Sequence, residues 1–163
     1  MIKKPSIRKM KKDNIILREI ADADTDFIVE LRNNPEVRKW FTNTAEITAD
    51  VHRSFLKKYY SEGNDDELYI IESDGKPSGM ISLYNISDGK AEWGRIAVHP
   101  DLQGRGYGKK ALQLIIERAK QKSLINLYCY VKKDNNKAIH LYESLGFETE
   151  REKGDEFRMN KPL

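Results

Sequence analysis

The glycine-rich run QGRGYG at residues 103–108 is the part of the sequence best suited to bind an anion. Glycine lets the backbone adopt positive φ and approach a ligand closely. Successive backbone N–H groups in such a loop, followed by a helix N-terminus, form a concavity that favours negative charge. The run therefore indicates a pyrophosphate site, to which Arg105 and Lys109 could add side-chain charge. An ordinary glycine turn before a helix is the alternative interpretation.

Two familiar phosphate-binding loops do not fit this run. A P-loop is excluded because neither Gly-Lys-Ser nor Gly-Lys-Thr follows the glycines. A dinucleotide fingerprint opens a βαβ unit, whereas the strand before residue 103 is expected to leave an antiparallel meander. The glycine run therefore belongs to a different kind of nucleotide site.

A second polar pattern follows about 30 residues later. Asn135, Ala138 and Tyr142 recur at helical spacing, so they fall on one face of a helix. The small residue between two polar ones leaves a groove where a thin ligand could lie. Ordinary core packing of Ala138 and Tyr142 is the alternative. We expect this helix to run from about residue 136 to 145 and to stop at Gly146.

Hydrophobic periodicity predicts the first elements that would position these motifs. Residues 14–18 are predicted to form a strand, and two amphipathic helices are expected over about residues 22–32 and after Thr48, which suits an N-cap. In the second helix the expected apolar stripe is Val51, Phe55, Leu56 and Tyr59.

The pattern then changes to period two. Asp-Gly pairs at 74–75 and 88–89 predict a three-stranded antiparallel meander over residues 67–98. A helix from near Gly108, the strand NLYCYV, the helix after residue 135 and two last strands complete the expected order. We therefore predict an α/β (α+β) sandwich, with a mixed, mostly antiparallel sheet of about six to seven strands flanked by about four helices.

The composition is typical of one globular domain. The chain has 163 residues, of which 39% are hydrophobic and 34% are charged. We expect residues 14–163 to form the domain and residues 1–13 to be a basic leader that is not a secretory signal. No stretch approaches ~18 apolar residues, so no membrane span is expected. The single cysteine, Cys129, cannot form an intrachain disulfide, suits a cytoplasmic location, and is expected to be a buried strand residue.

Charge argues against nucleic acid as a partner. The net charge is +3, and residues 1–12 contain six Lys and Arg, so the remainder is close to neutral. Those residues could be a solvated leader, or they could weakly attract a phosphate-bearing substrate. His52, His99 and His140 are not spaced with other ligands as in a metal site, so we expect no metal.

Together the two motifs resemble the GNAT superfamily of acyl-CoA N-acyltransferases. AEWGRIAVHPDLQGRGYG is similar to the acetyl-CoA pyrophosphate loop of that family, and NNKAIHLYESLGF is similar to its second cofactor motif. The expected order of elements agrees over residues 14–160. The resemblance implies the GNAT fold, acetyl-CoA as acyl donor, and acetyl transfer to a primary amine of a small molecule by a monomer or homodimer.

The resemblance also implies where acetyl-CoA binds. In the family, the third strand of the meander bulges and splays from the next strand, and pantetheine lies in that cleft. The matching backbone here is Ile96, Ala97 and Val98, facing residues 127–130. Asn135 would contact the pantetheine arm in the groove beside Ala138. The backbone amides expected to hold the pyrophosphate are those of Gln103, Gly104, Arg105, Gly106, Tyr107 and Gly108.

Catalytic roles follow from the same resemblance. The attacking amine must be neutral, whereas a free alkylamine has a pKa of about 10, so some group must accept a proton. Glu92 matches the catalytic glutamate of some members and would act directly or through water; a solvent-facing strand residue is the alternative. The Val98 N–H would stabilise the oxyanion. Tyr142 matches the general-acid tyrosine that protonates the leaving thiolate; a packed aromatic at the cofactor edge is the alternative.

Acceptor specificity in the family comes mainly from the N-terminal helices and the last hairpin. Residues 31–56 are similar to two branches, which acetylate nucleotide-linked amino sugars and the N-terminal amines of ribosomal proteins. Trp40 and Phe41 could stack on a sugar or a base, although core contact between helices is the alternative. The polar candidates are Arg32 or Arg38 for a phosphate, and Glu46 or His52 for the amine.

A non-catalytic acyl-CoA sensor on the same fold is a competing function. The presence of both Glu92 and Tyr142 argues for catalysis.

Overall fold

Eight strands and five α-helices make up the described part of the chain, residues 10–12 and 14–163 of a computed structural model. The strands are β1 (Met10–Lys12), β2 (Ile15–Glu19), β3 (Glu67–Ser73), β4 (Lys76–Ser87), β5 (Lys90–Val98), β6 (Asn126–Lys132), β7 (Glu148–Lys153) and β8 (Glu156–Pro162). The helices are α1 (Thr25–Asn33), α2 (Pro35–Arg38), α3 (Ala49–Tyr59), α4 (Tyr107–Gln121) and α5 (Asn136–Ser144), with 3-10 turns at Asp22–Asp24 and Pro100–Leu102.

All the strands join one sheet in the order β1-β2-β3-β4-β5-β6-β8-β7. Every neighbouring pair is antiparallel except β5 and β6, which are parallel. The expected mixed, mostly antiparallel fold is therefore confirmed. The additional strand, β1, lies within the expected leader and pairs with β2, while residues 1–9 and 13 of that leader lie outside the described residues.

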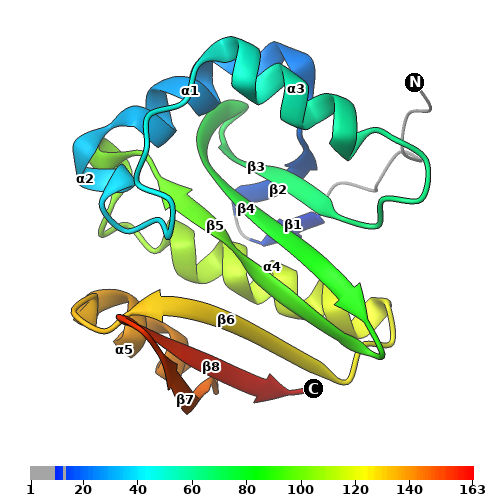
Figure 1. The fold of residues 1–163 in the computed structure, drawn as a ribbon, viewed down its shortest axis with the longest axis vertical. Helices are drawn as coiled ribbons and strands as arrows, with labels where there is room; N and C mark the ends of the chain where they lie inside the picture. The colour runs from blue at the N-terminus through cyan, green and yellow to red at the C-terminus, as the bar shows by residue number, and fades with distance from the viewer. Residues whose placement is uncertain (1–9, 13) are drawn as a thin grey trace.

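Hydrophobic side chains are buried on both faces of the sheet. Along β3, Tyr69 and Ile71 pack in one core with α4 and α5, whereas Leu68 and Ile70 pack in another with α1 and α3. Successive side chains of a strand point to opposite faces, so helices must cover both. Figure 1 shows α1–α3 on one side of the upper sheet and α4 behind it. No described helix is long and apolar enough to cross a membrane.

The hairpin turns of the meander form where the sequence predicts them. Asp74 and Gly75 have φ of 51° and 75°, and Asp88 and Gly89 have φ of 53° and 75°. Two successive residues with positive φ are the signature of the type I′ turn, which matches the twist of the paired strands. These turns set the register that brings β4 beside β5.

Two helical details differ from expectation. The short helix α2 was not expected from the sequence; it begins at Pro35, after Asn34 accepts a hydrogen bond from the N–H of Glu36 at 2.9 Å. Thr48 is confirmed as the N-cap of α3, accepting from the Val51 N–H at 3.2 Å. Leu56 and Tyr59 of the expected stripe are buried, but Val51 is 56% exposed and its neighbour His52 is buried instead.

A buried ion pair joins the meander to α4. Glu67 is 4% exposed and accepts hydrogen bonds from Arg118 at 2.9 Å, Lys122 at 3.1 Å and the Tyr69 hydroxyl at 2.7 Å. Burial alone would raise the pKa of Glu67, but the hydrogen bonds from Arg118, Tyr69 and Lys122 outweigh it and lower the pKa. Glu67 therefore stabilises the fold in its charged form.

Glu67→Gln is expected to lower the free energy of unfolding by about 3 kcal/mol at pH 7, because Arg118 and Lys122 lose their buried counter-charge. The contribution of a carboxylate with a lowered pKa is complete above its unfolded pKa of about 4.3 and disappears as pH falls through the folded value. The free energies of unfolding of the two proteins should therefore approach each other as pH falls below about 4 toward the lowered folded pKa. Urea unfolding at several pH values measures the difference in unfolding free energy. Glu46→Gln, which removes the exposed ion pair with Arg38, is the control. A pH-independent difference would contradict the assignment.

Candidate active site

A β-bulge interrupts the pairing of β5 with β4 at the middle of the sheet. Ser82 pairs with Gly94 and Met80 pairs with Ala97, so β5 carries one residue more than β4 between these pairs. Arg95 lies in this bulge with φ of 49°, a left-handed conformation that is rare for non-glycine residues. The bulge therefore lies at residues 95–96, at the start of the backbone segment expected to face the cofactor.

Beyond this point the described residues of β5 no longer pair with β6, and the Val98 carbonyl accepts a hydrogen bond from Gln103 Nε2 at 3.1 Å. The parallel pairing of β5 with β6 ends at Glu92 and Tyr128, and Figure 1 shows the two strands separating toward their C-terminal ends. The His99 N–H donates to the Ser78 carbonyl at 2.8 Å, so His99 and Ser78 form a hydrogen-bonded pair. Hydrogen-bonded and non-hydrogen-bonded pairs alternate along antiparallel strands, so the next pair, Gly79 and Val98, is a non-hydrogen-bonded one. The Val98 N–H and carbonyl are therefore directed away from β4. A thin amide-bearing ligand can add to such an edge.

A cavity of about 400 Å³ follows this edge from the glycine loop to α5. It is lined by twelve of the thirteen expected cofactor residues, namely Ile96, Ala97, Val98, Gln103, Gly104, Gly106, Tyr107, Gly108, Lys109, Asn135, Ala138 and Tyr142. Arg105, the thirteenth, is exposed and does not line it. The two sequence motifs therefore form opposite walls of a single cleft.

The glycine loop leaves the N-terminus of α4 open to a ligand. Gly104 and Gly106 have φ of 80° and 82°, and nothing lies within 4 Å of where their Cβ atoms would be. Gly106 is the N-cap, so no side chain caps the first turn, which also contains no acidic residue. The first N–H groups of a helix have no partner within the helix and favour an anion. The site therefore suits a phosphate group.

A second cavity of about 250 Å³ adjoins the first. Trp40, Ile96, Asn135 and Tyr142 line both, so the two spaces meet near the bulge. Residues 39–43 cover the second cavity and are tied to the C-terminal strands. Lys132 Nζ donates to the Lys39 carbonyl at 2.8 Å, and the Thr42 hydroxyl donates to Glu156 at 2.9 Å. We call this second cavity the acceptor cavity.

Glu92 lies in the acceptor cavity with both carboxylate oxygens occupied. The Tyr84 hydroxyl donates to Oε2 at 2.8 Å, and Asn85 Nδ2 donates to Oε1 at 3.0 Å. Gly94 makes this arrangement feasible, because a Cβ there would lie 2.8 Å from the Tyr84 hydroxyl oxygen. The carboxylate is therefore held in place and is not a freely rotating surface group.

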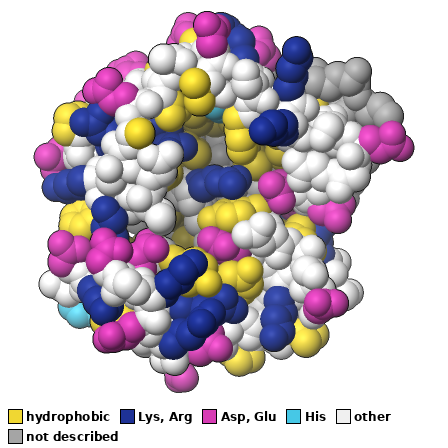
Figure 2. All heavy atoms as spheres, viewed as in Figure 1, with side chains coloured by type: hydrophobic (Ala, Val, Ile, Leu, Met, Phe, Trp, Pro, Cys, Tyr) yellow, Lys and Arg dark blue, Asp and Glu magenta, His cyan; other side chains and the backbone are white. Residues whose placement is uncertain are grey.

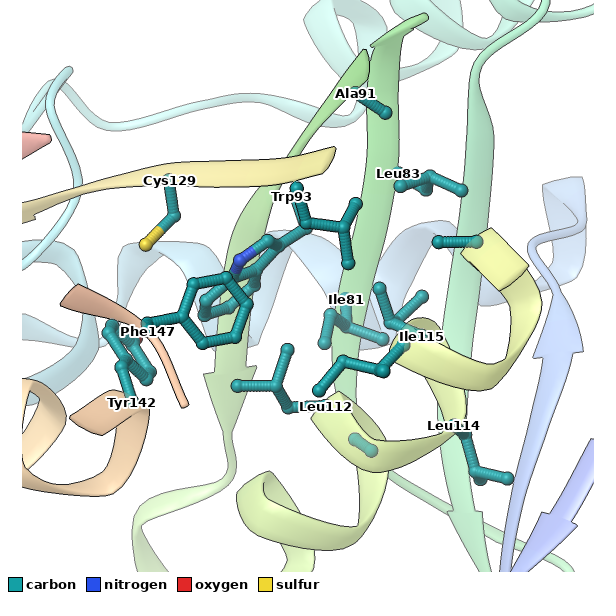
Figure 3. Packing of buried hydrophobic residues seen from close by; sticks show 14 of the residues in the cluster. Ile81, Leu83, Ala91, Trp93, Leu112, Leu114, Ile115, Cys129, Tyr142 and Phe147 are labelled. Carbon is teal, nitrogen blue, oxygen red and sulfur yellow. The ribbon is translucent and has the colours of Figure 1, made fainter. Parts of the chain in front are cut away.

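Tyr142 is 6% exposed and reaches both cavities from α5. Its ring meets that of Trp93 edge-to-face at 4.7 Å, with Phe147 on the same indole, as Figure 3 shows. Burial raises the pKa of the Tyr142 hydroxyl well above its ordinary value. The hydroxyl therefore keeps its proton at neutral pH. Cys129, also on the cavity wall, is buried as expected, and burial raises the pKa of its thiol.

The expected acceptor residues are only partly brought together. Arg32, Trp40 and Phe41 line the acceptor cavity, as does Glu92. Glu46 does not; it is exposed and pairs with Arg38 at 2.7 Å. His52 does not line the cavity either, being 5% exposed on the inner face of α3.

Tyr84 and Arg95 are among the cavity residues that the sequence analysis missed. Tyr84 belongs to the predicted meander, but only the register of β4 and β5 shows that it reaches Glu92. Arg95 carried a usable signal, because it follows the buried Ala91 and Trp93 at a spacing of two residues. A charged residue at an inward strand position indicates either a bulge or a ligand.

The fold and the open cleft together define an acyl-CoA-dependent acyltransferase. Residues 34–147 match the model of the Acetyltransferase (GNAT) family. Spermidine N(1)-acetyltransferase of Escherichia coli K12 is 32% identical over 151 residues, 90% of this chain and 80% of that enzyme. Acetyltransferase PseH of Campylobacter jejuni is 31% identical over 130 residues, 79% of this chain and 80% of its own.

Solved structures show the same fold. That of spermidine N-acetyltransferase from Vibrio cholerae in complex with CoA and spermine has a TM-score of 0.83 and 25% identity, covering 93% of this chain and 96% of that one. The chain therefore belongs to the acetyltransferase (GNAT) family, and it is an N-acetyltransferase with acetyl-CoA as its donor.

Proposed function

We propose that the acceptor is the primary amine of a small molecule of the amino-sugar nucleotide class. The observation that carries this is the character of the acceptor cavity. Trp40, Phe41 and Tyr130 provide aromatic faces, and Asn43 and Thr42 provide polar groups. Aromatic faces beside polar side chains suit a sugar ring, whose own faces are apolar and whose edges carry hydroxyls.

Acetyl-CoA supplies the acetyl group as a thioester, and the residues of this chain provide the proton transfers. Glu92 accepts the proton of the attacking amine, directly or through one water. A backbone N–H of β5 at Ile96 or Val98, beyond the pairing with β6, stabilises the oxyanion. The Tyr142 hydroxyl protonates the departing thiolate, and Asn135 orients the pantetheine arm. Asn135 Oδ1 caps α5 by accepting from the Ala138 N–H at 3.3 Å, so its Nδ2 is the group directed to the ligand.

Polyamines are the main competing acceptor, since two of the relatives act on spermidine. A polyamine carries several ammonium groups, each of which needs a negative or polar partner. Among the described residues that line the acceptor cavity, Glu92 is the single carboxylate, and the other charged side chains are Arg32 and Arg95. This charge distribution opposes a polycation. A peptide N-terminus has one ammonium group and remains the second candidate, because residues 31–56 also resemble that branch.

A panel of amines tests the proposal, with the thiol of released CoA as readout. We expect kcat/KM for an amino-sugar nucleotide to exceed that for spermidine by at least about 100-fold, equivalent to roughly 2.7 kcal/mol of transition-state binding. The kcat/KM for an N-terminal peptide should lie between these two values, or the peptide should show no turnover. Glu46→Gln, outside the cavity, is the control and should keep this order. Ready turnover of spermidine or peptide with none of any amino-sugar nucleotide would refute the proposal.

A further inference from the structure

Arg32 on α1 and Arg95 in the bulge of β5 both line the acceptor cavity, and neither forms an ion pair with the described carboxylates. Each has a buried nitrogen that finds no hydrogen-bond acceptor among the described residues, Nε of Arg32 and Nη1 of Arg95. The two guanidinium groups contact aromatic faces instead. Arg32 lies 4.1 Å from the centroid of the Phe41 ring, and Arg95 lies 4.0 Å from that of Tyr84. Their planar forks of N–H donors therefore remain available.

The other partly buried arginines in the described part of the chain are paired with carboxylates. The pairs are Arg18 with Asp24 and Glu72, Arg38 with Glu46, Arg118 with Glu67, and Arg158 with Glu150. An unpaired charge in a buried place is costly, so sequences seldom keep one without a reason. Arg32 and Arg95 are the exception among these partly buried arginines, and they are neighbours.

Glu92 is the single carboxylate among the described residues that line the cavity, so it offsets only part of the charge of the two arginines. Burial and the nearby positive charge of Arg95 lower the pKa of Arg32. The carboxylate of the cavity, Glu92, already accepts hydrogen bonds from Tyr84 and Asn85 at both oxygens. His52, beside Arg32, has its own pKa lowered by burial and by Arg32, so it adds no positive charge at neutral pH. Figure 2 shows Lys or Arg side chains within the central hollow of this face.

The backbone of Arg95 is also unusual. Its φ of 49° places it in the left-handed region, where a Cβ makes the conformation unfavourable. Such conformations persist where the surrounding structure imposes them, and they concentrate at ligand sites. Here the bulge directs the Arg95 side chain across Tyr84 and toward the cavity.

We propose that Arg32 and Arg95 form an anion subsite that binds an oxyanion group of the acceptor, a phosphate or a carboxylate, while its amine lies near Glu92. Guanidinium groups match both oxyanions geometrically and donate two parallel hydrogen bonds to either. The inference rests on the proposed function in one respect, that the acceptor occupies this cavity. An anion bound here offsets the positive charges of the two guanidinium groups.

Binding can be measured without turnover because the chain's two tryptophans, Trp40 and Trp93, both line the cavity. The protein is first saturated with CoA, which occupies the glycine loop and prevents anions from binding there. Tryptophan fluorescence then follows titration with inorganic pyrophosphate and glucosamine 6-phosphate in one arm, and with glucuronate in the other. Glucose and spermidine are the neutral and cationic comparisons. We expect at least one anionic arm to saturate, and spermidine to bind at least tenfold more weakly.

Arg32→Gln and Arg95→Gln should each weaken anion binding by tenfold or more, whereas Arg38→Gln should leave it unchanged. Arg95→Lys should retain part of the affinity. The melting temperature is a second readout. Removing an unpaired charge should leave the ligand-free protein as stable or more stable, and should abolish the rise in melting temperature that the anion causes in the wild type.

Three outcomes would overturn the subsite. These are no anion binding by the CoA-saturated wild type, anion binding that survives both glutamine substitutions, or a marked loss of stability in both ligand-free variants, as expected for structural arginines. The proposed function fails separately. If anions bind at Arg32 and Arg95 but no amine is acetylated, the subsite stands alone. If neutral amines are acetylated as well as their phosphorylated forms, the enzyme stands without the subsite.

Discussion

Tyr142→Phe is expected to lower kcat by about 100-fold or more while changing the KM for acetyl-CoA little. The substitution removes the hydroxyl and keeps the ring, so the edge-to-face contact with Trp93 and the packing of α5 should survive. A group that acts only on the leaving thiolate contributes in the transition state and not in the ground state. Such a loss therefore appears in kcat and kcat/KM together.

Tyr128→Phe is the matched control for this change. Tyr128 lies on β6 near the same cleft, is partly exposed, and lines neither cavity. Loss of the Tyr128 hydroxyl should leave kcat unchanged within about twofold. This factor corresponds to about 0.5 kcal/mol, the usual size of the effect of a surface substitution. If Tyr142→Phe instead raises KM for acetyl-CoA at unchanged kcat, Tyr142 is a packing residue at the cofactor edge.

The pH dependence of kcat offers an independent check on Tyr142. Burial raises the pKa of its hydroxyl above the ordinary value of about 10, because the charged phenolate is disfavoured in an apolar surrounding. The protonated, proton-donating form therefore persists to higher pH than for a free tyrosine. We expect no decline of kcat between pH 8 and about pH 10 that depends on this residue. A decline in that range that disappears in Tyr142→Phe would contradict the assignment.

The parts of the site that depend on local sequence could be predicted. Gly104 and Gly106 predict a loop with positive φ. Asn135 and Tyr142 share one helix face because of their spacing, independently of tertiary contacts. The Asp-Gly pairs likewise predict the turns of the meander, because few residues tolerate two successive positive φ values. Each of these features depends on neighbours within one turn of helix or one hairpin.

The parts that depend on register could not be predicted. The bulge at Arg95 shifts the pairing of β5 against β4 by one residue, and a one-residue shift changes which groups face the cleft. It also places Arg95 in the cavity beside Arg32. Glu46 lies in the connection between α2 and α3, and His52 lies on α3. The exposed pairing of the first and the burial of the second depend on packing between α1, α2 and α3.

Glu92→Gln is expected to lower kcat/KM by about 100-fold at pH 7, with the loss shrinking as pH approaches the pKa of the amine, about 10. At neutral pH the amine carries a proton that a base must accept, whereas near pH 10 solvent has already removed it. Glutamine keeps the shape of the side chain and can still accept the hydrogen bond of Tyr84. The pH profiles of the two proteins, measured on the same amine, should therefore approach each other on the alkaline side.

The pH dependence separates a base from a merely structural strand residue. If Glu92 only held Tyr84 and Asn85 in place, its replacement would reduce activity equally at every pH. Tyr84→Phe provides the complementary comparison, because it removes the 2.8 Å hydrogen bond to Glu92 and preserves the aromatic face beneath Arg95. A base that has lost its orienting partner should lose part of its activity and keep the same convergence at high pH. Gly94→Ala should act likewise, since its Cβ would displace the Tyr84 hydroxyl.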